Sequence, residues 1–123
     1  MRPVRQVLGP VLLAASLGVA LAGCGGTSAQ LIVTAEAIEF RPARVEVLAG
    51  APIQVVLRNL DAGVPHGLLI ATRTSGVLPR EIASLEITTG PSERAFDLPP
   101  LAAGPYLFSC PVHPTMQVEV DAR

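Results

Sequence analysis

The chain has 123 residues, half of them hydrophobic, and a formal net charge of −1 with histidine neutral. This length allows one domain with one hydrophobic core. A small negative charge argues against a nucleic-acid-binding protein, which needs a basic face.

The amino terminus has the layout of a secretory signal. Two arginines precede an apolar run at 7–22, and small residues then lead directly to Cys24. The Leu-Ala-Gly-Cys sequence at 21–24 resembles the bacterial lipobox. This resemblance implies that residues 1–23 are a lipoprotein signal peptide and that Cys24 is lipidated. An uncleaved membrane anchor is the alternative. Both place the rest of the chain on the outer (periplasmic or extracytoplasmic) face of the bacterial cell membrane.

A short tether and one domain are expected after the signal. Residues 24–30 are small and polar, which predicts a flexible tether of on the order of 13 Å before a domain at 31–123. Residues 1–23 contain two of the nine Lys and Arg and none of the ten Asp and Glu, so their removal leaves a net charge of −3. Such a charge gives little electrostatic steering of partners.

Period-two alternation of apolar and polar residues indicates short β-strands along the domain. The strands that we expect lie at 31–40, 45–47, 53–58, 67–71, 94–98, 106–110 and 117–120. A loop at 59–65 delivers His66. The pattern at 72–90 allows two interpretations, a short helix at 79–85 or a strand at 86–88. Seven or eight strands joined by Pro- and Gly-containing turns predict an all-β sandwich.

Cysteine use points to a metal site. The chain has two cysteines, and lipidation of Cys24 would leave Cys110 without a disulfide partner in an oxidising compartment. Alternation places the thiol on the same face of the 106–110 strand as two aromatic rings, so it points into the core. An inert buried cysteine is one explanation. His113 and Met116, three and six residues further on, favour a metal ligand instead.

Four side chains make up the ligand set that a single copper ion prefers. Two imidazoles and one thiolate in a trigonal arrangement, with a weak axial thioether, suit both Cu(I) and Cu(II). His66 and His113 are the only histidines, and Met116 is the only methionine once the signal is removed. A structural zinc site is the rival, but zinc favours more thiolates or histidines and does not use methionine. We therefore expect one copper ion bound by His66, Cys110, His113 and Met116.

From about residue 31 to 120 the chain resembles the cupredoxins, the family of blue-copper electron-transfer domains. The motifs that carry the resemblance are Phe40-x-Pro42, Val45-x-Val47 leading to Gly50, Asn59-x-Asp61 before His66, Gly104-x-Tyr106-x-Phe108-x-Cys110 and His113-Pro114-x-Met116. The resemblance implies a Greek-key sandwich with copper at one end. It assigns His66, Cys110 and His113 as equatorial ligands and Met116 as the axial ligand. The two-residue gap between His113 and Met116 is similar to the short ligand loop of amicyanins, whereas plastocyanins have a longer one.

Two features depart from the family pattern. Many cupredoxins carry an asparagine after the first histidine, where its side chain ties two loops together, but this chain has Gly67. A His-Gly step is similar to the dicopper domains of cytochrome oxidase and nitrous oxide reductase. Those sites need two cysteines in the ligand loop, and this loop has only Cys110, so a binuclear centre is excluded.

The resemblance also suggests residues around the ligands. The family geometry would aim the backbone N–H groups of Gly67 and Val112 at the Cys110 sulfur, where hydrogen bonds stabilise Cu(I) and raise the reduction potential. It would also expose an edge of His113 within an apolar patch suited to brief docking of redox partners. The patch that we expect consists of Val64, Pro65, His113 and Pro114.

These features together predict a monomeric one-electron carrier on the outer side of the plasma membrane. Its expected partners are membrane-associated respiratory or electron-transfer proteins. The ligands alone do not separate a carrier from an extracytoplasmic copper-handling protein that delivers copper to a cuproenzyme, which is the alternative. An enzyme such as a copper oxidase or nitrite reductase needs a second, histidine-rich copper site, and both histidines are already assigned. We therefore expect a protein that is not an enzyme.

Overall fold

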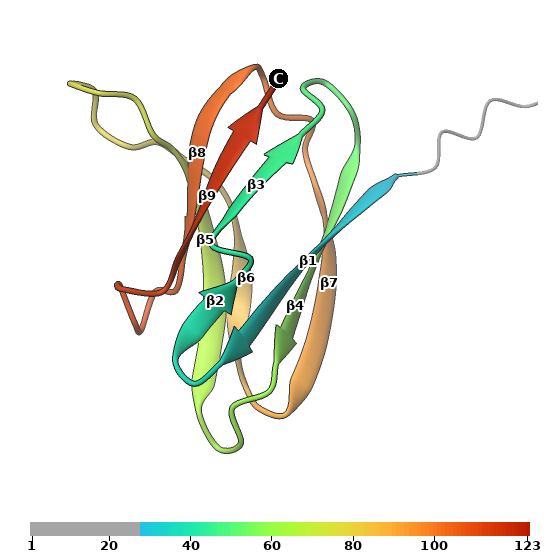
Figure 1. Ribbon diagram of the computed structural model, residues 1–123, viewed down its shortest axis with the longest axis vertical. Helices are drawn as coiled ribbons and strands as arrows, with labels where there is room; N and C mark the ends of the chain where they lie inside the picture. Colours follow the sequence, from blue (N-terminus) through green and yellow to red (C-terminus); the bar gives the residue numbers. More distant parts are fainter. Residues whose placement is uncertain (1–27) are drawn as a thin grey trace, which may run out of the picture.

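The computed structural model describes residues 28–123 and shows a β-sandwich (Figure 1). The expected signal peptide, Cys24 and the first part of the tether lie outside the described residues. Within residues 28–123 every regular element is a strand, and no helix there has the length and apolar character needed to cross a bilayer. The predicted all-β fold is confirmed.

The described residues form nine strands in two mixed sheets. The strands are β1 (Ala29–Glu36), β2 (Glu39–Arg41), β3 (Arg44–Val47), β4 (Ile53–Asn59), β5 (Pro65–Thr72), β6 (Glu81–Thr89), β7 (Ser92–Leu98), β8 (Gly104–Ser109) and β9 (Gln117–Ala122). One sheet has the order β2-β1-β4-β7 and the other the order β3-β9-β8-β5-β6. The pairs β1–β4 and β3–β9 are parallel. Strands that are distant in sequence thus lie side by side, as the predicted Greek-key sandwich requires.

The strand number corrects the seven or eight that we predicted. The strand expected at 31–40 is split into β1 and β2, because Ala37 and Ile38 adopt positive φ values of 54° and 58° and turn the chain back. The short helix considered at 79–85 is wrong, since β6 begins at Glu81 and pairs with β5. The alternative, a strand at 86–88, lies within β6. β6 lies at the edge of its sheet and none of its residues is fully buried, so its apolar pattern is weak.

Several strands begin earlier than predicted, and two of these shifts change the tether and the site. β1 starts at Ala29, so Ala29 and Gln30 belong to the sheet, where they pair with β4, and not to the tether. β5 starts at Pro65, which places His66 inside a strand and not at the end of a loop. His66 pairs with Thr88 of β6. The sheet therefore fixes the backbone that carries this imidazole.

The core lies between the two sheets, where alternate residues of β1 and β4 face alternate residues of β5, β8 and β9. The largest fully buried apolar side chains are Leu57, Leu68, Ile70, Leu101, Phe108 and Met116. Tyr106, Phe108 and Cys110 are 6%, 0% and 1% exposed. The predicted inward direction of this face is confirmed, and the thiol continues a buried row of side chains.

The Tyr106 hydroxyl stabilises the turn before β8, and a substitution can test this contribution. It donates a hydrogen bond of 2.8 Å to the Ala102 carbonyl and so fixes the turn that leads into β8. Tyr106→Phe keeps the ring and removes this bond, and we expect the free energy of unfolding to fall by about 0.5–1.5 kcal/mol. Urea denaturation of the metal-free protein measures the change. An unchanged midpoint at constant m value would contradict this role.

Candidate metal centre

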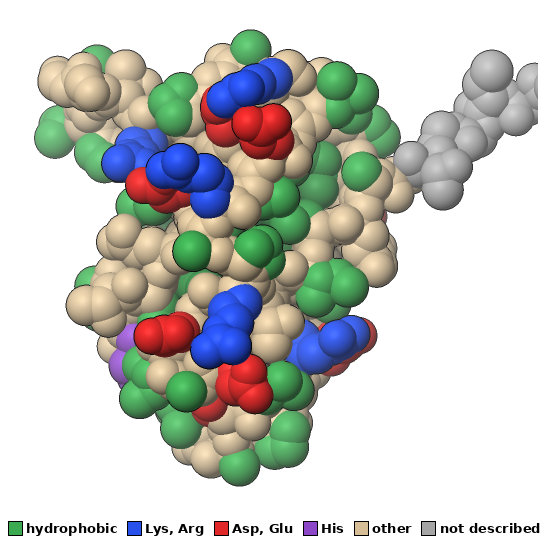
Figure 2. Space-filling view, viewed as in Figure 1, with side chains coloured by type: hydrophobic (Ala, Val, Ile, Leu, Met, Phe, Trp, Pro, Cys, Tyr) green, Lys and Arg blue, Asp and Glu red, His purple; other side chains and the backbone are tan. Residues whose placement is uncertain are grey.

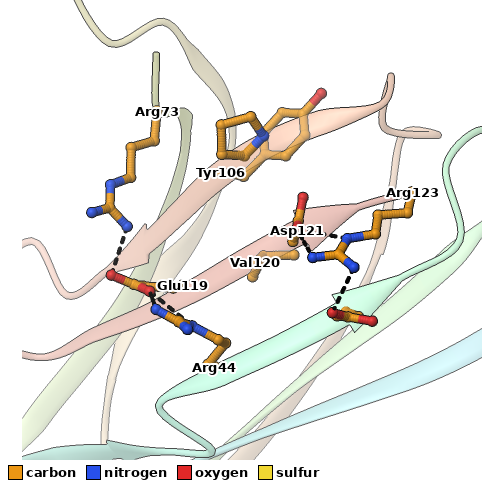
Figure 3. A pocket seen from close by; sticks show the side chains of 9 residues that line it. Arg44, Arg73, Tyr106, Glu119, Val120, Asp121 and Arg123 are labelled. Atoms are coloured by element: carbon orange, nitrogen blue, oxygen red, sulfur yellow. Dashed lines mark hydrogen bonds and ion pairs between the residues drawn. The ribbon is translucent and has the colours of Figure 1, made fainter. Parts of the chain in front are cut away.

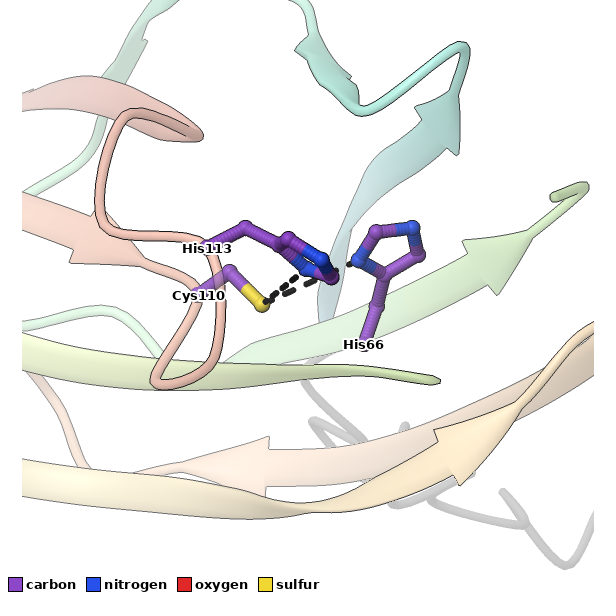
Figure 4. A group of neighbouring side chains, drawn as sticks. All are labelled: His66, Cys110 and His113. Carbon is purple, nitrogen blue, oxygen red and sulfur yellow. Dashed lines mark hydrogen bonds between the residues drawn. The ribbon is translucent and has the colours of Figure 1, made fainter. Parts of the chain in front are cut away.

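The nitrogen and sulfur ligands predicted from the sequence lie together at one end of the sandwich (Figure 4). His66 comes from β5, Cys110 directly follows β8, and His113 lies in the loop between β8 and β9. The Cys110 Sγ lies 3.8 Å from Nδ1 of His66 and 3.7 Å from Nδ1 of His113. All three ligand atoms lie within 4.8 Å of one another. The two imidazoles and the thiol therefore converge on a space that one metal ion fits.

Backbone hydrogen bonds close the loop between β8 and β9. The Cys110 N–H donates to the Met116 carbonyl at 3.1 Å, and the Met116 N–H donates to the His113 carbonyl at 2.9 Å. The Gln117 side chain also donates to the Pro114 carbonyl at 2.9 Å. Because the loop prolines have a fixed φ as well, the conformation of the ligand loop is set by the protein itself.

Met116 supplies the fourth candidate ligand. It is 1% exposed and belongs to the same buried cluster as Cys110. Its backbone hydrogen bond to Cys110 keeps the two residues adjacent. Two imidazoles, one thiolate and one thioether suit copper, whereas zinc does not use methionine. The donor set therefore fits the predicted copper ion and not the zinc alternative.

The Nε2 nitrogen of His66 contacts a carboxylate for which the sequence analysis predicted no role. His66 Nε2 lies 2.8 Å from Oδ2 of Asp61, and the His66 side chain is fully buried. The Asp61 carboxylate also accepts the N–H groups of Ala37 at 2.6 Å and Ile38 at 3.0 Å. The hydrogen bond from Ile38, assisted by those from His66 and Ala37 and opposed by burial, lowers the pKa of Asp61 from its ordinary value. Asp61 thus links the β1–β2 turn to a candidate metal ligand.

A second residue without an assigned role, Asn59, braces the loop before β5. Its fully buried side chain donates to the carbonyls of Val64 at 2.8 Å and Thr88 at 3.1 Å, and it accepts the Asp61 N–H at 3.0 Å. Gly67 stands where many cupredoxins carry an asparagine that ties two loops together. In this chain the side chain of Asn59, on the opposite side of the loop before β5, makes such a connection. The Asn59-x-Asp61 motif was the sequence signal for both residues, although it did not reveal their contacts.

Gly67 has a packing role. A Cβ at this position would lie 3.0 Å from the Leu85 carbonyl oxygen and 3.1 Å from Cγ1 of Ile87, where the register between β5 and β6 shifts. Val112 lies in the ligand loop and is 43% exposed. The hydrogen bonds expected from the N–H groups of Gly67 and Val112 to the Cys110 sulfur stay a prediction.

The surface around His113 is largely apolar. The His113 ring is partly exposed, and its centroid lies 4.9 Å from that of His66. The other members of the predicted patch are partly or fully exposed: Val64, Pro65 and Pro114. The neighbouring turns add three exposed apolar side chains: Ile38, Leu60 and Val112. In Figure 2 histidine reaches the surface at the left edge, next to a group of hydrophobic side chains.

A polar hollow over β3, β8 and β9 contains no comparable ligand set (Figure 3). Its ion pairs are Arg44–Glu119, Arg73–Glu119, Arg123–Asp121 and Arg123–Glu46. The hydrogen bond from Arg44 is the largest cause that lowers the pKa of Glu119. Every charge that lines the hollow has an opposite partner within it, so the hollow offers no unbalanced charge to a ligand.

Comparison with known proteins agrees with this site. The family model for the cupredoxin-like domain matches residues 11–120, and the chain belongs to the cupredoxin family. Auracyanin from the photosynthetic bacterium Roseiflexus castenholzii has a similar structure, with 17% identity, a TM-score of 0.67 and coverage of 80% of this chain and 99% of that one. Rusticyanin from Thiobacillus ferrooxidans has 18% identity, a TM-score of 0.61 and coverage of 79% of both chains. No curated protein matches the sequence.

A third solved structure, a variant of amicyanin in its reduced Cu(I) form, has 18% identity and a TM-score of 0.56, with coverage of 81% of this chain and 88% of that one. The predicted family and sandwich are thereby confirmed. Family and ligand cluster also agree with the predicted cofactor, a single copper ion.

Gly90 tests how closely the brace around His66 is packed. A Cβ there would lie 2.4 Å from the Asp61 carbonyl oxygen and 2.6 Å from Asn59 Oδ1. We expect Gly90→Ala to displace both residues, to lower the free energy of unfolding by about 1–3 kcal/mol and to shift the His66 imidazole NMR signals of the metal-free protein.

The matched control is Gly76→Ala, at a turn where a Cβ has no neighbour within 4 Å but φ is 75°. It should lower stability through backbone strain alone and leave the His66 signals in place. Unshifted His66 signals in Gly90→Ala would show that the brace does not position this ligand.

Proposed function

We propose that this protein is a mononuclear type 1, or blue, copper protein that carries single electrons. The observation that carries the proposal is the set of two imidazole nitrogens and one sulfur within 4.8 Å, next to a buried methionine. Because this donor set suits both Cu(I) and Cu(II), a bound copper ion supplies one-electron chemistry with little ligand movement. Auracyanin A from Chloroflexus aurantiacus, a blue copper protein, supports the proposal through its similar fold.

The two histidines differ in their access to solvent. His66 is fully buried, whereas part of the His113 ring is exposed. We infer that a redox partner docks on the apolar patch formed by Val64, Pro65, His113 and Pro114 and exchanges its electron through the His113 ring. Interfaces between redox partners are small and brief, which suits a patch of this kind on a protein of low net charge.

The use of histidine favours a carrier over an enzyme. The chain has two histidines, and both lie in this cluster. A copper oxidase or nitrite reductase would need a further site with histidine ligands. A protein that delivers copper to a cuproenzyme would use the same four ligands. The two functions therefore differ in how firmly the protein retains its copper ion.

We also propose that the protein is a lipoprotein, anchored through Cys24 on the outer side of the plasma membrane, and that its partners are membrane-associated electron-transfer proteins. The sequence before Cys24 supports this location. β1 enters the sandwich beside the start of β4, whereas His66 follows the end of β4. The copper site therefore lies at the end opposite to the start of β1 (Figure 1). A domain attached before β1 would direct this site away from its attachment point.

Copper binding tests the proposed site directly. We expect the purified protein to take up one equivalent of Cu(II) and to develop an intense visible thiolate-to-copper band. Cys110→Ser should abolish the band, because the thiolate is the donor. Cys24→Ser changes the other cysteine of the chain and serves as the matched control, which should keep the band. A colourless wild-type product with Cu(II) would contradict the proposal.

The reduced protein then separates a carrier from a copper-handling protein. A carrier should retain Cu(I) in the presence of a competing Cu(I) chelator, since it must hold the ion in both oxidation states. Rapid loss of Cu(I) from a protein that is blue when oxidised would favour delivery of copper.

Electron self-exchange tests the docking patch without a known partner. Two copies that meet through their apolar patches should exchange electrons, and NMR line broadening in mixtures of oxidised and reduced protein measures the rate. Val112→Glu adds a negative charge in the ligand loop beside the patch. A pair of like charges about 4 Å apart in water costs about 1 kcal/mol, so we expect exchange to slow by up to roughly fivefold at low salt.

The control for this charge is Leu78→Glu, which changes an 88% exposed side chain in the loop between β5 and β6. That loop lies at the end of β5 opposite to His66. Exchange should stay at the wild-type rate in this variant. Equal slowing in both variants would place the contact elsewhere.

A further inference from the structure

The geometry points to Asp61 as a positioning residue that selects the metal-binding nitrogen of His66 and lowers the reduction potential of the bound copper. This inference deepens the proposed function and rests on it. The contact that carries it is the 2.8 Å approach of Asp61 Oδ2 to His66 Nε2. The opposite ring nitrogen, Nδ1, faces the Cys110 sulfur at 3.8 Å.

The hydrogen-bond partners of Asp61 define its charge state and the tautomer of His66. Its carboxylate faces two backbone N–H donors, from Ala37 and Ile38, as well as His66 Nε2. Each carboxylate oxygen already accepts a backbone N–H group, which is the role of the ionised, acceptor-only form. Nε2 must then carry the proton, which leaves the lone pair of Nδ1 free for copper. Since His66 is fully buried, no solvent donor or acceptor competes for this choice.

The position of the carboxylate is fixed from two sides. The Ala37–Ile38 turn has positive φ at both residues, where such a turn usually carries Asn or Gly. This conformation points consecutive N–H groups at one anion, and Asp61 occupies that place. On the other side, the Asp61 N–H is held by Asn59 Oδ1 at 3.0 Å. A hairpin 23 residues upstream is therefore part of the support of a copper ligand.

The negative charge has a direct consequence for the metal. A carboxylate behind a ligating imidazole raises the basicity of that ligand. It also attracts the more highly charged Cu(II) more strongly than Cu(I), and the Asp61 side chain is only 13% exposed, so water screens it weakly. Asp61 should thus act against the expected amide–sulfur hydrogen bonds, which favour Cu(I).

Redox titration of the copper-loaded protein tests this effect. Asp61→Asn removes the charge at nearly constant volume. We expect the ratio of Cu(I) to Cu(II), at a fixed poise of a one-electron redox buffer, to rise about tenfold, which corresponds to 59 mV. Asp97→Asn is the matched control, because Asp97 is an exposed acid on β7 that pairs with Gln54 near the far end of the sandwich. It should change the ratio less than twofold.

Nitrogen-15 NMR of the metal-free wild-type protein gives a second readout that needs neither copper nor a variant. We expect His66 to be the Nε2–H tautomer, with an Nε2 proton that exchanges slowly with water. An Nδ1–H tautomer would overturn the inference, even if Asp61→Asn failed to fold.

The two proposals fail in different ways. A wild-type protein that forms no thiolate-to-copper band would refute the blue-copper function, while the NMR result would still decide the Asp61 contact. Blue wild-type and Asp61→Asn proteins with the same Cu(I) to Cu(II) ratio would refute the role of Asp61 and leave the proposed function intact.

Discussion

The hydrogen bond between the Cys110 N–H and the Met116 carbonyl is the contact on which the metal end of this protein depends. It closes the connection between β8 and β9, which pair with each other from Gly104 and Ala122 down to Ser109 and Gln117. Both strands lie inside their sheet, flanked by β3 and β5, so neither end of the loop is free to move. A thiol, an imidazole and a thioether are thereby confined within one short loop, and a second strand needs to supply only one more ligand.

β5 supplies that ligand because it is the hydrogen-bonded neighbour of β8. The pairing places Leu69, three residues after His66, opposite Ser109, the residue directly before Cys110. Sheet pairing alone would leave the ring of His66 free to rotate. The contact with Asp61 removes that freedom from one side, and the backbone of Gly67 packs against β6 without space for a side chain. The distance between His66 and Cys110 is thus set by the sheet, and the direction of the imidazole by contacts from outside it.

The sequence predicted the parts that depend on residue type and on short-range period. The alternation Tyr106-x-Phe108-x-Cys110 correctly predicted that the thiol points inward. The small number of histidine, cysteine and methionine residues was sufficient to name the candidate ligands. The sequence offered a strand at 86–88 only as an alternative to a helix and missed the rest of β6, because an edge strand is exposed enough to lose its alternation, and pairing with β5 overrides local propensity. Nor did it predict the turn at Ala37 and Ile38. Neither residue favours positive φ, and the carboxylate that stabilises the turn lies more than 20 residues further on.

The same long-range contacts bury His66, whereas His113 stays partly exposed, and this difference in solvent access bears on the proposed electron transfer. One imidazole is enclosed by the core, a carboxylate and the Phe40 ring, with the two rings in a T-shaped arrangement and their centroids 6.4 Å apart. The other sits in the β8–β9 loop with part of its ring in solvent and apolar neighbours around it. Rigid enclosure of one ligand limits how far the site can rearrange when the charge of the metal changes, while exposure of the other gives a partner close approach to it. The charged side chains that line the polar hollow neutralise one another over β3, β8 and β9. Docking at the copper end would therefore depend on shape and apolar contact more than on charge, which favours an interface that forms and separates quickly.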